Sequence, residues 1–246
     1  MNTAADLQNK RVAIIGGSSG IGFAVARRCL AHGARVHIGS RDAGKVEAAT
    51  TRLGANASGS IVDVRDEESV SAYFEQAGEL DHLVYTAGDW DTIRTANPIA
   101  NLDLDVASSV FGVRFWGVLL AVKHALPHLS DGGSITLTNG MVAHRPRKGA
   151  VLNTAMAGAL EHLTRSLAVD LAPVRVNAVC PGMVLTEVWD SVPADERDER
   201  IRQMTERQPL ARAANPAEVA EAYLYSMRGT YTTGQVFVVD GGMALV

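Results

Sequence analysis

Seven short apolar runs, separated by longer segments of helical periodicity, divide this chain of 246 residues. The runs are rich in Val and Ile and read RVAIIG, RVHIGS, SGSIVDV, HLVYTAG, GSITLT, VRVNAV and QVFVVD. Between them apolar side chains recur at helical spacing, as at Leu160, Leu163 and Leu167. Strands that alternate with helices form parallel sheets with helices on both faces. The pattern predicts an α/β fold with a doubly wound, seven-stranded parallel sheet in three layers.

Composition favours one globular domain over residues 1–246 that acts on a small molecule. Hydrophobic residues make up 47% of the chain, enough for one substantial core. The formal net charge of −4 provides no basic excess for a nucleic acid or an anionic membrane. The most apolar later stretch, residues 115–126, is too short to span a bilayer and contains Lys123 and His124. We therefore expect no nucleic-acid and no membrane partner.

The two cysteines indicate a reducing compartment. Cys29 lies in a predicted helix face and Cys180 at a predicted strand end, and two cysteines are too few for a disulfide scaffold. We therefore expect a cytoplasmic protein, and we predict no metal site.

A glycine-rich turn follows the first predicted strand and leads directly into a helix. It reads GGSSGIG, with Gly16, Gly20 and Gly22 in a GxxxGxG spacing around Ser18, Ser19 and Ile21. Glycines permit a tight turn and let a pyrophosphate approach the helix N-terminus. An isolated glycine motif is equally typical of a plain turn, but this position between strand and helix favours a dinucleotide site.

The end of the second predicted strand indicates which dinucleotide binds. NAD sites usually carry an acidic residue there for the ribose 2′-hydroxyl, whereas this chain has Ser40 and Arg41. A hydroxyl and a guanidinium suit a 2′-phosphate. Asp42 argues for NAD, but its position one residue later is typical of a helix N-cap. We therefore predict NADP(H) in preference to NAD(H).

Further motifs make the chain resemble the short-chain dehydrogenase/reductase family over almost its full length. They are Asp63-Val64, TAG at 86–88, RVNAVCPG at 175–182, Thr186, and VVDGG near the C-terminus. The resemblance implies a Rossmann-type domain in which Asp63 and Val64 contact adenine and Ala87 and Gly88 line the ribose. It also implies a nicotinamide contact with the segment that contains Pro181, Gly182, Val184 and Thr186. It further implies that this chain forms a homotetramer or homodimer, since relatives pair through helices like the one at AVLNTAMAG.

The resemblance stops at the catalytic residues. The family uses an Asn, a Ser, and a Tyr and Lys spaced YxxxK, and the corresponding positions here are Arg114, Gly140, Asn153 and Ala157. No tyrosine occurs between Tyr85 and Tyr223, so a displaced tyrosine in a shifted loop is excluded. All four catalytic positions are therefore substituted.

Arg114 and His144 are the candidate replacements. Arg114 would supply a fixed positive charge that stabilises a developing anion or the ribose. Alternatively, it would pair with Asp103 or Asp105 or lie at a subunit interface. His144, four residues after the serine position, would donate a proton near neutral pH or remain a solvated loop residue. The basic loop Arg145 to Lys148 suggests an acidic substrate group, although a solvated loop explains it as well.

Residues 186–212 are predicted to form an amphipathic lid over the substrate. Trp189, Ile201 and Met204 are its candidate closing side chains, and ordinary packing is the alternative.

The sequence thus predicts an NADP(H)-dependent oxidoreductase that reduces a carbonyl, imine or enone with an unusual proton donor or none. The loss of four catalytic positions leaves open a catalytically silent NADP(H)-binding protein, either a sensor or a partner subunit. Non-redox chemistry in the same pocket is a third alternative.

Overall fold

The strands form a single parallel sheet in the order β3-β2-β1-β4-β5-β6-β7. The computed structural model describes residues 7–88 and 99–246, without the side chains of 104–106. The described strands are β1 Arg11–Ile15, β2 Arg35–Ser40, β3 Ala57–Ile61, β4 Leu80–Tyr85, β5 Leu129–Thr138, β6 Arg175–Pro181 and β7 Val236–Val239. Each neighbouring pair runs parallel. The doubly wound, seven-stranded α/β fold is therefore confirmed.

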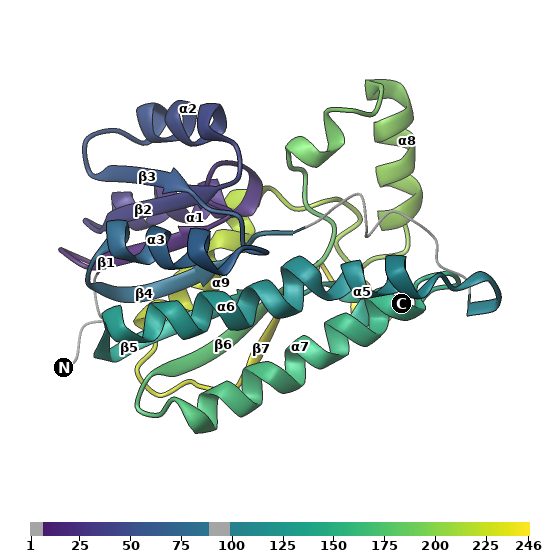
Figure 1. Cartoon of the computed structure of the whole chain (residues 1–246). Coiled ribbons are helices and arrows are strands. Elements are labelled where there is room, and N and C mark those ends of the chain that lie inside the picture. The colour runs from purple at the N-terminus through teal and green to yellow at the C-terminus, as the bar shows by residue number, and fades with distance from the viewer. Residues whose placement is uncertain (1–6, 89–98) are drawn as a thin grey trace.

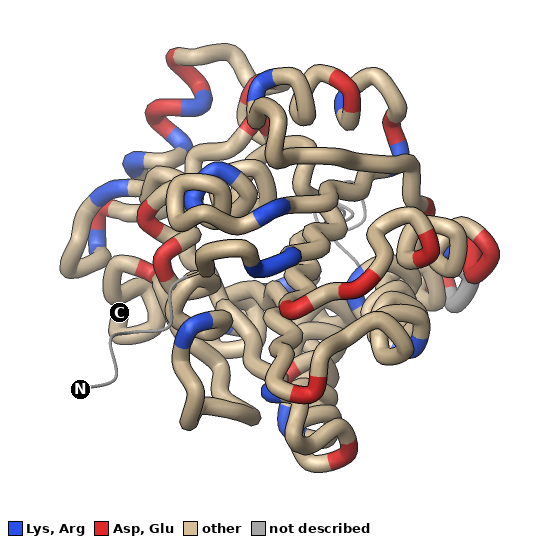
Figure 2. The backbone as a smooth tube through the Cα atoms, turned by 90° about the vertical axis from the view of Figure 1, so that its left-hand side faces the viewer, with Lys and Arg blue, Asp and Glu red and all other residues tan. Residues whose placement is uncertain are grey.

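Helices cover both faces of this sheet (Figure 1). One face carries α1 Gly20–Ala31, α2 Ala43–Leu53 and α9 Pro216–Arg228, and the other carries α3 Glu67–Ala77, α6 Gly117–Ala125 and α7 Val151–Asp170. The other α-helices of the described residues are α5 Leu104–Phe111 and α8 Ala194–Thr205. Acidic and basic positions are intermixed along the chain in Figure 2. The view shows no face of a single charge.

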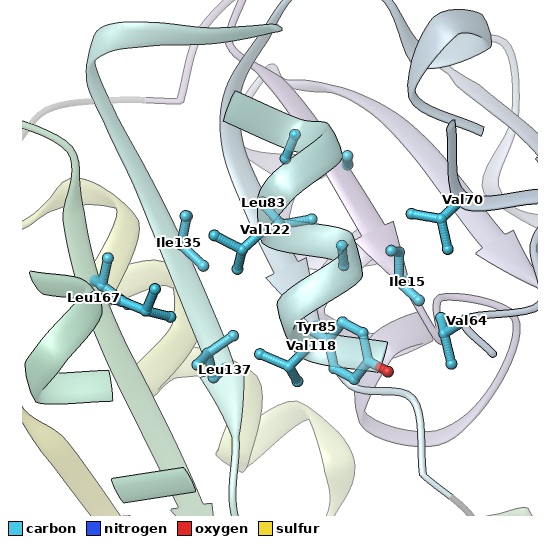
Figure 3. Close-up of a cluster of buried hydrophobic side chains, with 14 of the residues drawn as sticks. Ile15, Val64, Val70, Leu83, Tyr85, Val118, Val122, Ile135, Leu137 and Leu167 are labelled. Atoms are coloured by element: carbon cyan, nitrogen blue, oxygen red, sulfur yellow. The ribbon is translucent and has the colours of Figure 1, made fainter. Parts of the chain in front are cut away.

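The core on the α6 and α7 side is close-packed against the sheet. Ile15, Leu83 and Ile135 of the strands are at most 1% exposed and meet helical side chains such as Val118 and Leu167 (Figure 3). Full burial of one such side chain stabilises the fold by about 1.5–3 kcal/mol. The packing fixes the ends of the strands, which form the candidate site.

The apolar helical stretch before β5 is longer than the sequence analysis predicted. By length and composition, one helix within the described residues is apolar enough to cross a membrane, Ala107–His128, with a mean hydropathy of 1.3. Of this stretch, Val113, Val118 and Val122 are buried in the core cluster beside the sheet. Core packing accounts for the apolar character of these three positions.

Among the described helices, α2, α3 and α9 begin with a side-chain cap, whereas α1, α7 and α8 do not. Asp42 accepts a hydrogen bond from Lys45 N in α2, as predicted, and Asp66 and Asn215 cap α3 and α9. Ser19, the N-cap of α1, makes no such bond, and no acidic residue lies in the first turn of α1. The first amides of α1 therefore need acceptors from elsewhere.

Buried histidines are expected to make the fold sensitive to acid. His82 is 5% exposed, Nδ1 of its ring lies 2.8 Å from Ser134 Oγ, and burial lowers the pKa of His82 to about 4. Between this value and its ordinary pKa of 6.5, the unfolded chain binds the proton and the folded chain does not. The contribution of His82 is therefore complete above pH 6.5 and is lost as the pH falls toward 4, about 3 kcal/mol in all.

Urea unfolding between pH 4 and 8 measures this dependence. The variant His82→Gln should show a flatter pH profile of unfolding free energy, whereas His162→Gln, an exposed position of α7, should keep the wild-type slope. Equal slopes in wild type and His82→Gln would contradict the prediction.

Candidate functional site

The candidate site lies where the carboxyl ends of the central strands meet. Gly16 N donates to Gly39 O at 2.8 Å, and Thr86 N donates to Ile15 O at 2.8 Å. Asn139 N donates to Val179 O at 2.8 Å. These bonds bring the loops after β1, β4 and β5 to one edge of the sheet, the usual position of ligands in open parallel sheets.

The glycine-rich turn forms a cradle with no room for side chains. A Cβ on Gly16 would lie 2.6 Å from Ala87 N, and a Cβ on Gly22 would overlap Gly16 O and Thr86 Oγ1. Thr86 Oγ1 donates to Gly16 O at 3.1 Å, so the turn is fastened to the loop after β4. A backbone surface of this kind, at a helix N-terminus, suits a pyrophosphate.

A carboxylate from a distant segment contacts the start of α1. Gly20, with φ +54°, donates its N–H to Glu187 Oε2 at 2.8 Å. The methyl carbon of Thr186 lies 3.2 Å from the Cβ position of Gly20. Gly20 and Thr186, two predicted coenzyme residues, are therefore neighbours in the fold although they lie far apart in the sequence. Glu187 was not predicted, because no local pattern links it to Gly20.

The other predicted coenzyme residues line the same edge or support it. Ser40 ends β2, and Arg41 is exposed directly after it. Asp63 Oδ1 accepts from Arg65 N at 3.0 Å, whereas the Val64 side chain is 4% exposed in the core. A Cβ on Gly182 would lie 2.7 Å from Asp240 Cα, so this glycine permits close approach of two loops. The remaining residues of the set are Ser18, Ser19, Ile21, Ala87, Pro181 and Val184.

Arg114 reaches the crevice from a π-helical turn at Gly112–Trp116, between α5 and α6. A Cβ on Gly88 would lie 2.6 Å from Nη2 of Arg114, and a Cβ on Gly140 would lie 3.9 Å from Nη1. The guanidinium thus lies between the ends of β4 and β5. π-turns are frequent at functional sites. Of the alternative partners, the Asp105 side chain lies outside the described residues.

No ionisable side chain occupies the positions of the family's tyrosine and lysine. Asn153 and Ala157 of α7 are 3% and 1% exposed, and Gly140 starts a short helical turn at Met141–Ala143. Tyr85 and Tyr223 are buried, which raises the pKa of each phenol, and Tyr223 Oη lies 2.7 Å from Thr138 Oγ1. Neither tyrosine is placed to replace the missing proton donor.

His144 is held by a carboxylate of α7. Its Nε2 lies 2.8 Å from Glu161 Oε1, which also accepts from Asn139 Nδ2 at 3.2 Å. The His144 side chain is 32% exposed. In the basic loop, Arg145 Nη1 donates to the backbone oxygen of Met243 at 3.0 Å. Arg114 and His144 therefore have different neighbours, and the role of each as a catalytic residue stays a prediction.

The predicted lid contains α8, which stands beyond the helices that cover the sheet (Figure 1). Met204 is 45% exposed. Trp189 lines a surface hollow of about 770 Å³ together with Gly20, Phe23 and Arg27 of α1. Its indole therefore lies beside α1, and closure of residues 186–212 over a substrate stays a prediction.

Known proteins share this architecture throughout the chain. A family model described as enoyl-(acyl carrier protein) reductase matches residues 15–244. The malC protein of Malbranchea aurantiaca, described as a short-chain dehydrogenase/reductase, is 35% identical, and the match covers 97% of this chain and 96% of that protein. This chain is a short-chain dehydrogenase/reductase. The resemblance inferred from the motifs is confirmed.

Solved members of the family match the structure closely. MalC, described as a reductase/Diels-Alderase, has a TM-score of 0.89 at 33% identity, with 98% of each chain covered. A small-chain dehydrogenase in complex with NADPH has a TM-score of 0.83 at 34% identity, covering 97% of this dehydrogenase/reductase and 100% of that chain. An NADPH-bound short-chain oxidoreductase from Pseudomonas aeruginosa, described as containing an atypical catalytic center, has a TM-score of 0.86 at 30% identity, with 95% and 96% covered. NADPH is thus a coenzyme of some relatives.

Proposed function

We propose that this dehydrogenase/reductase binds NADP(H) and reduces a carbonyl, imine or enone without the family's tyrosine and lysine. The observation that carries the proposal is the Arg114 guanidinium between Gly88 and Gly140. A preorganised cation at the mouth of a coenzyme cradle stabilises negative charge that develops on an acceptor.

The residues of the cradle fit a dinucleotide. The glycines let the turn pack closely against the loop after β4, and the first turn of α1 has no side-chain cap of its own, so its amides suit a pyrophosphate. Ser40 and Arg41 would hold the 2′-phosphate, and Gly88 and Thr186 would contact the nicotinamide half. NADPH, when bound, would supply the hydride.

Without a positioned general acid, the site favours acceptors that can take up hydride without a proton transfer in the same step. A positioned general acid contributes roughly 10²- to 10⁴-fold, whereas holding two reactants together is worth an effective concentration of roughly 10⁵ M or more. An iminium carbon accepts hydride without forming an oxyanion. For an enone or ketone, Arg114 would stabilise the developing oxyanion, and His144, oriented by Glu161, would deliver the proton.

Non-redox chemistry is the second candidate, supported by a relative described as both a reductase and a Diels-Alderase. A pocket that orients one unsaturated substrate also lowers the entropic barrier to its cyclisation. Such a reaction would proceed without net consumption of NADPH.

Coenzyme titration and a substrate panel test the proposal. We expect tighter binding of NADPH than of NADH by fluorescence, and NADPH oxidation that is faster with imines than with enones or ketones. Arg41→Ala should raise the Kd for NADPH at least about tenfold and leave that for NADH within about twofold, because only NADPH carries the 2′-phosphate. Arg52→Ala, which removes a guanidinium stacked on Phe23 outside the cradle, is the matched control.

Each alternative predicts a different result in the same experiment. Equal affinity for both coenzymes would contradict the role of Arg41. Tight NADPH binding without turnover on the whole panel would support the silent coenzyme-binding protein, and product formation without NADPH oxidation would support non-redox chemistry.

A further inference from the structure

The N-terminus of α1 takes its acceptor from a residue 167 positions away. Gly20 N donates to Glu187 Oε2 at 2.8 Å, although α2, α3 and α9 are all capped by their own adjacent side chains. A helix N-terminus carries partial positive charge and stabilises a nearby anion. Glu187 therefore supplies the N-terminus of α1 with a negatively charged acceptor, as a phosphate would.

A carboxylate and a pyrophosphate compete for this position. The Gly20 amide has one hydrogen to donate, and it is already directed at Glu187 Oε2. The Glu187 side chain also brings a negative charge to the start of α1, where the pyrophosphate of a dinucleotide would bring two more. The carboxylate and the pyrophosphate would repel each other because both are negatively charged. Coenzyme binding therefore requires the carboxylate to leave or imposes an electrostatic cost.

We propose that Glu187 gates the pyrophosphate site: its carboxylate occupies the Gly20 amide in the coenzyme-free protein and is displaced when a dinucleotide binds. This inference rests on the proposed coenzyme function. It makes Glu187 a determinant of coenzyme affinity that acts on NADPH and NADH equally, because both carry the same pyrophosphate.

The backbone around Glu187 permits this movement. Leu185 N donates to Ala214 O at 3.0 Å, and Val184 pairs with Ala214, so the chain is anchored just before the gate. After the anchor, Glu187–Trp189 forms one short helical turn. The Glu187 side chain is solvent-exposed, so its carboxylate can move from Gly20 into water.

The gate has opposite effects on stability and on affinity. In the coenzyme-free protein, Glu187 stabilises the end of α1, and removal of its charge lowers stability. In the coenzyme complex, its removal eliminates the competitor and increases affinity. If Glu187 had a purely structural role, its removal would lower the stability of the protein and its affinity for coenzyme together.

Coenzyme titration of wild type, Glu187→Gln and Asp190→Asn tests the gate. Asp190 lines the same hollow, so its variant removes an equal charge without touching Gly20. For Glu187→Gln we expect the Kd for NADPH and for NADH to fall by the same factor, about three- to tenfold. The coenzyme-free melting temperature should fall by about 1–3 °C. Asp190→Asn should leave both Kd values within about twofold.

Three results would overturn the gate. An unchanged or higher Kd in Glu187→Gln would mean that the carboxylate does not compete. An equal fall in Kd for Asp190→Asn would mean that net charge, and not the Gly20 contact, is responsible. If neither wild type nor variant binds either coenzyme, the coenzyme function itself is wrong and the gate is rejected with it.

Discussion

Arg114→Ala should lower the rate of NADPH oxidation by about 10²- to 10³-fold with an enone or ketone acceptor, which is the usual effect of removing one preorganised oxyanion partner. The Kd for NADPH should stay within about threefold, since the cradle at Gly16 and Gly22 is separate from the guanidinium. Single-turnover rates and coenzyme titration on the same preparation measure the two quantities. With an iminium acceptor the loss should be smaller, because no oxyanion forms.

Two further variants make this result interpretable. Arg114→Lys keeps the charge but loses the planar fork, and it should retain more activity than Arg114→Ala. Arg52→Ala, the control used above, removes an exposed cation outside the cradle and should leave the rate unchanged. Unchanged turnover in Arg114→Ala, with circular dichroism showing a folded protein, would remove Arg114 from the mechanism.

Gly22→Ala should abolish coenzyme binding, with a rise in Kd of at least about a hundredfold, and destabilise the fold by about 3 kcal/mol or more. The added methyl would overlap the backbone oxygen of Gly16 and the hydroxyl of Thr86. Gly16 is itself held by two hydrogen bonds, since its N–H donates to Gly39 O and its carbonyl accepts from Thr86 Oγ1. The turn can therefore make room for the methyl only by breaking these bonds. Coenzyme titration and urea unfolding measure both effects.

Gly44→Ala is the matched control for Gly22→Ala, because it makes the same substitution in the first turn of another helix. Its new methyl would meet only Asp42 Oδ1, at 3.4 Å, and Gly44 lies in the first turn of α2. Because alanine restricts the unfolded chain more than glycine, we expect stabilisation of about 0.5–1 kcal/mol. Equal destabilisation by both substitutions would show that the cradle has no special steric constraint.

The fold was predictable because its determinants repeat along the chain. Seven apolar runs and the intervening helices specify a parallel sheet, and the glycine turn marks the site at its edge. The third strand was misjudged at its end: residues 62–64 were predicted to continue it, but β3 stops at Ile61. Asp63 accepts a hydrogen bond from Arg65 N, a local turn that removes these residues from the ladder although Val62 and Val64 are apolar.

The contacts that define the chemistry were not predictable, because they join residues far apart in the sequence. The pairing of His144 with Glu161 depends on how the loop after β5 packs on α7. The position of Arg114 depends on a π-helical turn at Gly112–Trp116, and the sequence of this segment has no periodicity that predicts such a turn. The resemblance to the family placed Arg114 at a catalytic position, but only the structure shows that Gly88 leaves room for its guanidinium.

The contact between Gly20 and Glu187 also has a consequence for biosynthesis. A chain that emerges from the ribosome N-terminus first completes β1, α1, β2 and β3 long before Glu187 is made. During that interval the first amides of α1 have neither a local cap nor their carboxylate partner. If a dinucleotide displaces Glu187 as proposed, its pyrophosphate would also bind these amides during translation and act as a folding ligand for the nascent chain.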